Sequence, residues 1–185
     1  MIWNNHSYLK DKHSFLSPSN YSWLNYDEEK LTERYLNHLA VQRGTALHKL
    51  AEDHINLHIP MPRTKKTLDR YVNDAIGYGM DAEIPLEYSK NAFGTTDAIL
   101  FKKDFLRIHD LKTGVTPASI KQLYIYAAYF CLEYDIRPGD IQMETRIYQN
   151  NDVVIANPTA EDIFPIMDKI VAFDRRIEAI NNGDI

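Results

Sequence analysis

The chain has 185 residues, of which 26 are acidic and 21 basic, and its formal net charge is −5. This length suits one compact domain with a real core and excludes a helicase motor or a second catalytic module. The acidic balance argues against a nucleic-acid contact that covers the whole surface. Local basic clusters, such as Lys102, Lys103 and Arg107, could still follow a phosphate backbone or simply form solvated faces.

The first third of the chain is predicted to be helical. Ser17-Pro18 is typical of a helix start. From Asp27 to His58 apolar residues recur at helical spacing, and we expect Gly44 to break this segment into two helices. Residues 65–80 carry apolar side chains at four-residue intervals (Leu68, Val72, Ile76 and Met80), which predicts a further amphipathic helix.

The middle of the chain changes character and predicts a sheet. Residues 83–88, 93–102 and 105–112 form short runs separated by polar or glycine-containing turns, as consecutive antiparallel strands do. Thr116-Pro117 should open a helix that continues to about Tyr134, followed by strands over 141–149 and 153–156. A last helix is expected after Asn157-Pro158, with one apolar face formed by Ile163, Ile166, Ile170, Phe173 and Ile177.

This order of elements predicts an α/β fold with a central mixed sheet flanked by helices and a helical N-terminal region. We expect a single domain over residues 1–185, in which 1–81 are mainly helical, 82–156 hold the catalytic sheet and a helix, and 157–185 form the C-terminal helix. Cys131, the one cysteine, lies in an apolar run and is predicted to be a buried thiol. The apolar runs are too short for a signal peptide or a membrane span, so we expect a soluble, cytoplasmic protein.

Two aspartates and a lysine lie on the predicted central strands. Asp97 lies on one strand, and Asp110-Leu111-Lys112 ends the next. Carboxylate oxygens hold divalent cations, which neutralise a phosphodiester and activate water. Because strand side chains repeat with period two, Lys112 projects from the same face as Asp110 and can orient or deprotonate water beside a cation. The pattern indicates a metal-dependent phosphodiesterase, and whether Lys112 is the base or a positioning group stays open.

Other polar residues are candidates for the same site. Gln122 and Tyr126 share a helix face and could hydrogen-bond phosphate oxygens or metal ligands, although a core role for the tyrosine is the alternative. His48 could offer a ring nitrogen to a metal, against the ordinary reading of a hydrogen-bonded histidine. Glu83 is a further candidate carboxylate, with Glu87 as its competitor on the same strand.

Five sequence elements in this order resemble the RecB-like branch of the PD-(D/E)XK nuclease superfamily, and among its members the stand-alone, phage-type exonucleases. The resemblance covers most of residues 44–126 and rests on GTALH with His48, on Glu83, and on GTTDAILF, IHDLKTG and QLYIY. It implies a restriction-endonuclease-like core. It also implies that His48, Asp97, Asp110 and the Leu111 carbonyl bind Mg²⁺ or Mn²⁺, that Lys112 serves the nucleophilic water, and that Gln122 and Tyr126 support the site and the DNA.

The resemblance therefore predicts a metal-dependent deoxyribonuclease, an exonuclease that processes DNA ends in phage recombination, replication or repair. A structure-specific or nicking endonuclease, and a non-catalytic DNA-binding or assembly subunit, are the alternatives. Many relatives hold an iron–sulfur cluster through four cysteines, and because this chain has one cysteine we expect no cluster. A single-strand-annealing protein or a helicase would be a reasonable partner, in the cytoplasm of a bacterial host cell. The oligomeric state does not follow from the sequence.

Overall fold

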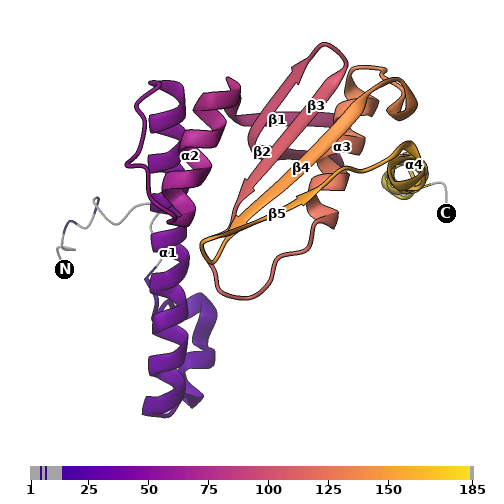
Figure 1. Ribbon diagram of the computed structural model, residues 1–185. Coiled ribbons are helices and arrows are strands. Elements are labelled where there is room, and N and C mark those ends of the chain that lie inside the picture. Colours follow the sequence, from indigo (N-terminus) through magenta and orange to yellow (C-terminus); the bar gives the residue numbers. More distant parts are fainter. Residues whose placement is uncertain (1–4, 6, 8–13, 184–185) are drawn as a thin grey trace. The chain divides into compact units, whose positions relative to one another are not determined.

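The computed structural model describes residues 5, 7 and 14–183 (Figure 1). The chain divides into two compact units, residues 1–45 and 46–185. The boundary falls within the long helix α1 (Glu28–Asn56), whose last turns belong to the second unit. The single domain expected over residues 1–185 stays a prediction.

The first unit contains the short helix η2 (Pro18–Asn25) and the first turns of α1. Pro18 stands in the first turn of η2, as expected, although the helix is of the tighter 3-10 type. The Trp23 ring nitrogen donates a hydrogen bond to the Ser17 carbonyl at 3.1 Å. The ring of Phe15 meets that of Tyr35 edge-on, with 5.2 Å between centroids.

The predicted break at Gly44 is wrong, because α1 runs through this position without interruption. Glycine keeps its backbone N–H and costs a helix interior only about 1 kcal/mol relative to alanine, whereas proline removes the hydrogen bond. The Thr45 hydroxyl donates to the Val41 carbonyl one turn earlier, at 3.2 Å, as it does in a continuous helix. Glycine alone was therefore insufficient evidence for a break.

The second unit is built on a five-stranded sheet in the order β1 (Asp81–Ser89), β2 (Ala92–Lys102), β3 (Phe105–Leu111), β4 (Gln142–Gln149) and β5 (Asp152–Ala156). Strands β3 and β4 are parallel, and the other neighbours are antiparallel. The turns at Lys103-Asp104 and Asn150-Asn151 have positive φ at both residues, the backbone of a tight hairpin. The predicted α/β fold with a mixed sheet flanked by helices is confirmed.

Helices cover both faces of this sheet (Figure 1). Helices α3 (Lys121–Glu133) and α4 (Ala160–Asn181) pack on one face around a core that includes Leu106, Ile108 and Leu123. Helix α2 (Thr67–Tyr78) and the last turns of α1 pack on the other, around Ile55, Val72 and Tyr148. We call these the α3 face and the α2 face. The short helix η3 (Pro138–Asp140) precedes β4.

The predicted start of α3 at Thr116-Pro117 is wrong, since the helix begins at Lys121. The reason is a long-range contact: the Gln149 amide on β4 donates to the carbonyls of Gly114 and Thr116 and accepts from the Ala118 N–H. The Thr116 carbonyl, which would accept the first hydrogen bond of a helix that starts at Pro117, is thus bonded to the Gln149 side chain instead. A prediction from local sequence signals does not include a hydrogen-bond partner on a distant strand.

Helix α4 begins two residues after Pro158, with a capping box between Thr159 and Asp162. Its residues Ile163, Ile166 and Ile170 pack on the α3-face core as expected. The two later residues of the predicted apolar face, Phe173 and Ile177, are 60 % and 39 % exposed. Cys131 is buried in the same core, as predicted, and burial raises the pKa of its thiol to about 11. No helix in the described part of the chain has the length and apolar content of a membrane-crossing segment.

Candidate metal centre

Three carboxylates lie at one level on adjacent strands. Ala82 pairs with Ala98 and Ile84 with Thr96, so Glu83 stands opposite Asp97. Ala98 pairs with His109, which brings Asp97 level with Asp110 on β3. Directly opposed residues of neighbouring strands have Cβ atoms about 5 Å apart. The sheet register therefore gathers negative charge in a row across β1, β2 and β3.

At this level β1 changes face. Ala82 belongs to the α2-face core, whereas Ile84 and Leu86 pack on the α3 face, although residues two apart in a regular strand point the same way. Glu83 has φ 53°, in the left-handed region that glutamate rarely adopts. A strained residue of this kind re-aims its neighbours and often marks a functional site. The strain at Glu83 thus accounts for the change of face.

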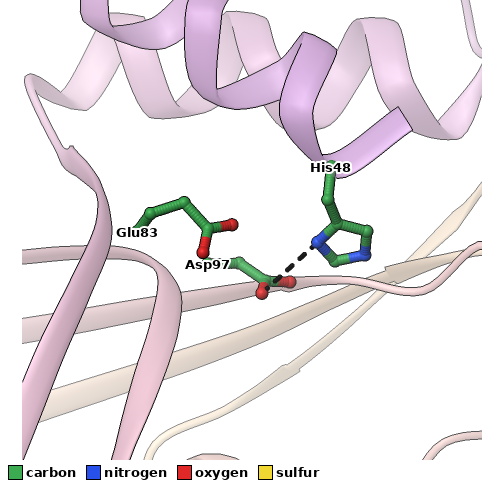
Figure 2. Close-up of side chains that lie close together, drawn as sticks. All are labelled: His48, Glu83 and Asp97. Atoms are coloured by element: carbon green, nitrogen blue, oxygen red, sulfur yellow. Dashed lines mark ion pairs between the residues drawn. The ribbon is translucent and has the colours of Figure 1, made fainter. Parts of the chain in front are cut away.

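His48 completes a cluster with Glu83 and Asp97 (Figure 2). Its Nδ1 lies 3.5 Å from Asp97 Oδ1, and one ligand atom from each of these residues lies within 4.8 Å of the other two. The interaction with the Asp97 carboxylate raises the pKa of His48 above its ordinary value. Burial, followed by repulsion from Asp97, raises the pKa of Glu83. A cation placed among these groups would relieve both shifts.

Asp110 is the buried member of the row, with 3 % of its surface exposed. Its Oδ1 lies 3.0 Å from Lys112 Nζ, which also donates a 2.9 Å hydrogen bond to Gln122 Oε1 on α3. Its Oδ2 is buried, and no hydrogen-bond donor in the described residues reaches it. Burial, and then the charge of Asp97, raises the pKa of Asp110 to about 6. An acceptor atom of this kind is costly unless a ligand satisfies it.

Asp97 also holds the end of β3 in place. Its Oδ2 accepts a 2.7 Å hydrogen bond from the Leu111 N–H, and the Leu111 side chain is buried in the α2-face core. The same carboxylate therefore faces His48 and fixes the backbone between Asp110 and Lys112. No pattern in the sequence predicts this bond. The role of the Leu111 carbonyl as a metal ligand stays a prediction.

Tyr126 lies beside β2 at Gly94. A Cβ added to Gly94 would lie 3.0 Å from Tyr126 Cε1, so any larger residue would press on the ring. Burial raises the pKa of the Tyr126 phenol. Tyr126 lies one turn after Gln122, whose side chain accepts from Lys112. The two α3 residues predicted for the site therefore lie on the side of the sheet that carries Lys112.

The structure distinguishes between the two candidate glutamates on β1. Glu83 joins His48 and Asp97, whereas Glu87 is exposed, and its backbone N–H donates to the Glu133 carboxylate at 2.9 Å. A period-two pattern placed both on one face, but the left-handed backbone at Glu83 breaks that pattern. Only Glu83 remains a candidate for the metal centre.

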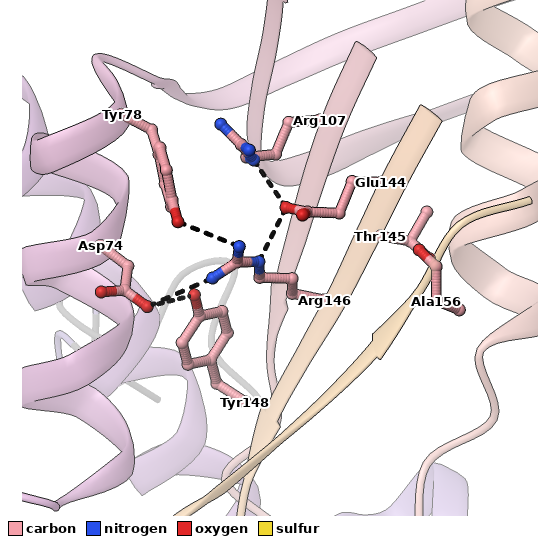
Figure 3. A network of polar contacts seen from close by, with 8 residues as sticks. All are labelled: Asp74, Tyr78, Arg107, Glu144, Thr145, Arg146, Tyr148 and Ala156. Carbon is pink, nitrogen blue, oxygen red and sulfur yellow. Dashed lines mark hydrogen bonds and ion pairs between the residues drawn. The ribbon is translucent and has the colours of Figure 1, made fainter. Parts of the chain in front are cut away.

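A polar network anchors the neighbouring strand from the α2 face (Figure 3). Glu144 accepts from Arg107 and Arg146 at 2.7 and 2.8 Å, and the Tyr148 hydroxyl donates to Asp74 at 2.7 Å. The Tyr148 carbonyl in turn accepts from the Lys112 N–H at 2.9 Å. Arg107 is therefore committed to this network and to the Tyr78 ring, 3.7 Å away, rather than to the basic surface suggested by the sequence.

The donor set suits a hard divalent cation. His48, Glu83 and Asp97 offer ligand atoms within 4.8 Å of one another, whereas Asp110 lies outside this group, level with Asp97 on β3. Carboxylate oxygens and an imidazole nitrogen are ligands that Mg²⁺ and Mn²⁺ accept. Asp110 Oδ2 accepts no hydrogen bond from the described residues, and burial, followed by repulsion from Asp97, raises the pKa values of Asp110 and Glu83. The residues therefore fit a metal, with His48, Glu83, Asp97 and Asp110 as the candidate ligands.

Comparison with known proteins adds no assignment. No protein-family model matches the chain, and a search of curated proteins finds no match. The interpretation of the site rests on the sequence motifs and on the geometry described above.

Proposed function

We propose that this chain is a metal-dependent deoxyribonuclease of the RecB-like PD-(D/E)XK type, with the mixed sheet as its restriction-endonuclease-like core. The observation that carries the proposal is the convergence of four groups: a buried Asp110 with a free oxygen, Asp97 level with it, His48 facing Asp97, and Lys112 beside Asp110. An acid row with one adjacent cationic donor can hold a divalent cation beside a group that orients water, which is what metal-assisted phosphodiester hydrolysis uses.

His48, Glu83, Asp97 and Asp110 would hold the cation. When bound, Mg²⁺ or Mn²⁺ supplies charge neutralisation at the phosphate and lowers the pKa of water. The chain's own contribution is rigidity. Asp97 is fixed by the Leu111 N–H and by His48, and both strands that flank it are locked in the sheet. Preorganised ligands of this kind reduce the reorganisation that a reacting site needs.

Lys112 and Gln122 would position the reacting groups. Lys112 Nζ is held between Asp110 Oδ1 and Gln122 Oε1, and an ammonium has three donors, so one remains for a water or a phosphate oxygen. Because Gln122 uses its oxygen on Lys112, its amide N–H groups can donate to the phosphate. Tyr126, one turn later, would support the same edge of the substrate. In this proposal Lys112 orients the attacking water.

Within this chemistry we favour an exonuclease that processes DNA ends in phage recombination, replication or repair. A partner that delivers the end, such as a single-strand-annealing protein or a helicase, belongs to the same proposal. Cleavage at internal sites would make the chain a structure-specific or nicking endonuclease instead. The motif resemblance supports the exonuclease. The geometry of the site is compatible with an exonuclease and with an endonuclease.

The test is digestion of end-labelled linear DNA beside closed circular single- and double-stranded DNA, with Mg²⁺, Mn²⁺ or a chelator. The native chain is compared with Lys112→Ala and with Lys169→Ala, which removes an exposed lysine on α4. We expect metal-dependent loss of linear DNA, abolished by Lys112→Ala and unchanged by Lys169→Ala. Cleavage of closed circles would establish the endonuclease. Absence of cleavage by the native chain on every DNA would overturn the proposal.

A further inference from the structure

The loop between Lys112 and Lys121 connects two parts of the proposed site. Lys112 ends the motif on β3, and Gln122 begins the polar face of α3. The hydrogen bond from Lys112 to Gln122 closes the base of this loop at 2.9 Å. Residues Thr113 to Pro117 are exposed. The loop therefore borders the site and faces solvent.

Side chains of the β4–β5 hairpin hold this loop in one conformation. Gln149 donates to the carbonyls of Gly114 and Thr116 at 2.6 and 2.7 Å and accepts from the Ala118 N–H at 3.0 Å. Asn150 donates to the Val115 carbonyl at 3.2 Å. Side-chain bonds of this kind restrict the loop before it meets a partner, which reduces the entropy lost on binding.

Val115 lies at the exposed end of this ordered loop. Its exposed fraction, 81 %, is the highest among the large apolar residues of the described chain. An isolated exposed valine needs no explanation. Here, however, the carbonyls of Gly114, Val115 and Thr116 all accept hydrogen bonds from the β4–β5 hairpin, so the backbone that carries the side chain is held in place. The loop lies beside the site and presents an apolar side chain to solvent. It is therefore suited to contact a ligand bound at that site.

The charge around the site indicates which ligand approaches over the loop. Residues 111–132 contain no acidic residue in a chain whose net charge is −5. Of their two lysines, Lys112 is paired with Asp110 and Lys121 is exposed at the end of the loop. The β1 side of the site instead carries Asp81, Glu83 and Glu87. A polyanion such as DNA is therefore repelled by the acidic residues of β1 and can approach the site over the loop.

We propose that the 113–120 loop is a substrate-binding surface of the proposed nuclease, over which a DNA strand passes beside the scissile phosphate. Val115 packs against the sugar or base of a neighbouring nucleotide, and Lys121 contacts a phosphate. Apolar side chains insert against bases in many DNA-binding proteins, and lysine neutralises phosphates without reading sequence. This inference rests on the proposed function and identifies the side of the site by which substrate is held.

The test measures binding separately from cleavage. Fluorescence anisotropy of labelled single-stranded and duplex oligonucleotides with Ca²⁺ gives Kd, and cleavage with Mg²⁺ gives KM and kcat. Val115→Asp should raise Kd and KM about tenfold, equivalent to about 1.4 kcal/mol, with a much smaller effect on kcat. Gln149→Leu, which frees the loop, should raise Kd in the same direction. Val115→Ile, which keeps an apolar side chain, should bind DNA with the native Kd.

The matched control is Val154→Asp, because Val154 is also exposed, at 55 %, but lies on β5 rather than beside Lys112. Equal Kd values for the native chain and Val115→Asp would overturn the inference, as would an equal loss in Val154→Asp. A native chain that binds DNA through Val115 but cleaves none would overturn the proposed function and leave the binding surface standing. A native chain that binds no DNA would overturn both.

Discussion

Replacing Asp110 by asparagine should stabilise the metal-free protein at neutral and alkaline pH. The folded chain buries this carboxyl, leaves Oδ2 without a donor and places Asp97 beside it. Burial and the charge of Asp97 raise its pKa to about 6. Asparagine keeps the shape and an acceptor for Lys112 but carries no charge. The site residue is therefore expected to be a source of instability, as functional groups often are.

The magnitude follows from the pKa difference. An aspartate with an ordinary pKa of 3.8 and a folded value of about 6 disfavours the folded, ionised protein by about 3 kcal/mol. The favourable effect of Lys112 is already contained in that value. Between these two pH values the folded state binds more protons than the unfolded state, so this group lowers the free energy of unfolding as the pH rises. Above about pH 6 the full destabilisation is present.

The assay is denaturant unfolding of the native chain and Asp110→Asn in a chelator, at about pH 4 and about pH 8. The variant should be about 3 kcal/mol more stable at the higher pH and nearly equal to the native chain at the lower one. Added Mn²⁺ should stabilise the native chain more than the variant, because the folded native site binds the cation. Asp104→Asn, at an exposed turn, serves as the control and should show neither effect.

A variant that is less stable than the native chain at about pH 8 in chelator would refute this reasoning. It would mean that the pairing with Lys112 outweighs the burial of the charge. Equal stabilisation of the two proteins by Mn²⁺ would show that Asp110 does not contribute to the cation site.

Three further perturbations test the same centre. His48→Ala should weaken Mn²⁺ binding by about 10- to 100-fold in calorimetric titration, and unchanged affinity would remove the imidazole from the ligand set. The Mn²⁺ affinity of the native chain should fall as the pH drops through about 6, because the cation requires ionised Asp110; a flat profile would contradict its assignment. Gly94→Ala should destabilise the fold by about 1 kcal/mol through contact with Tyr126, and thermal unfolding should show a smaller cost in a Tyr126→Ala background.

Local signals in the sequence were enough to predict the sheet and its polar row. Alternating runs and turn residues placed the strands, and the two tight turns formed where polar pairs separate them. The period-two rule also placed Lys112 beside Asp110, 3.0 Å away in the structure. These features depend on residues near one another in sequence or on adjacent strands.

The break predicted at Gly44 was wrong because a local signal was given too much weight, and the other errors arose where the sequence pattern does not contain the deciding feature. Gln149 holds residues 114–118 as a loop, so α3 begins later than Thr116-Pro117 predicts. The left-handed backbone at Glu83 changes the face of β1, which no alternation pattern reveals. The sequence suggested that Arg107 is a surface charge, whereas its guanidinium pairs with Glu144 and lies over the Tyr78 ring. At the loop and at Arg107, tertiary contacts override the local preference.

The most direct test of the account is cleavage of linear DNA as Mn²⁺ is titrated into the native chain and Asp97→Asn. Asp97 faces His48 and holds the Leu111 N–H, so the centre depends on it more than on any other carboxylate. We expect cleavage by the native chain to rise with Mn²⁺ and to be absent in the chelator, and we expect Asp97→Asn to cleave at no Mn²⁺ concentration. Native-level cleavage by Asp97→Asn, or cleavage by the native chain in the chelator, would contradict this expectation.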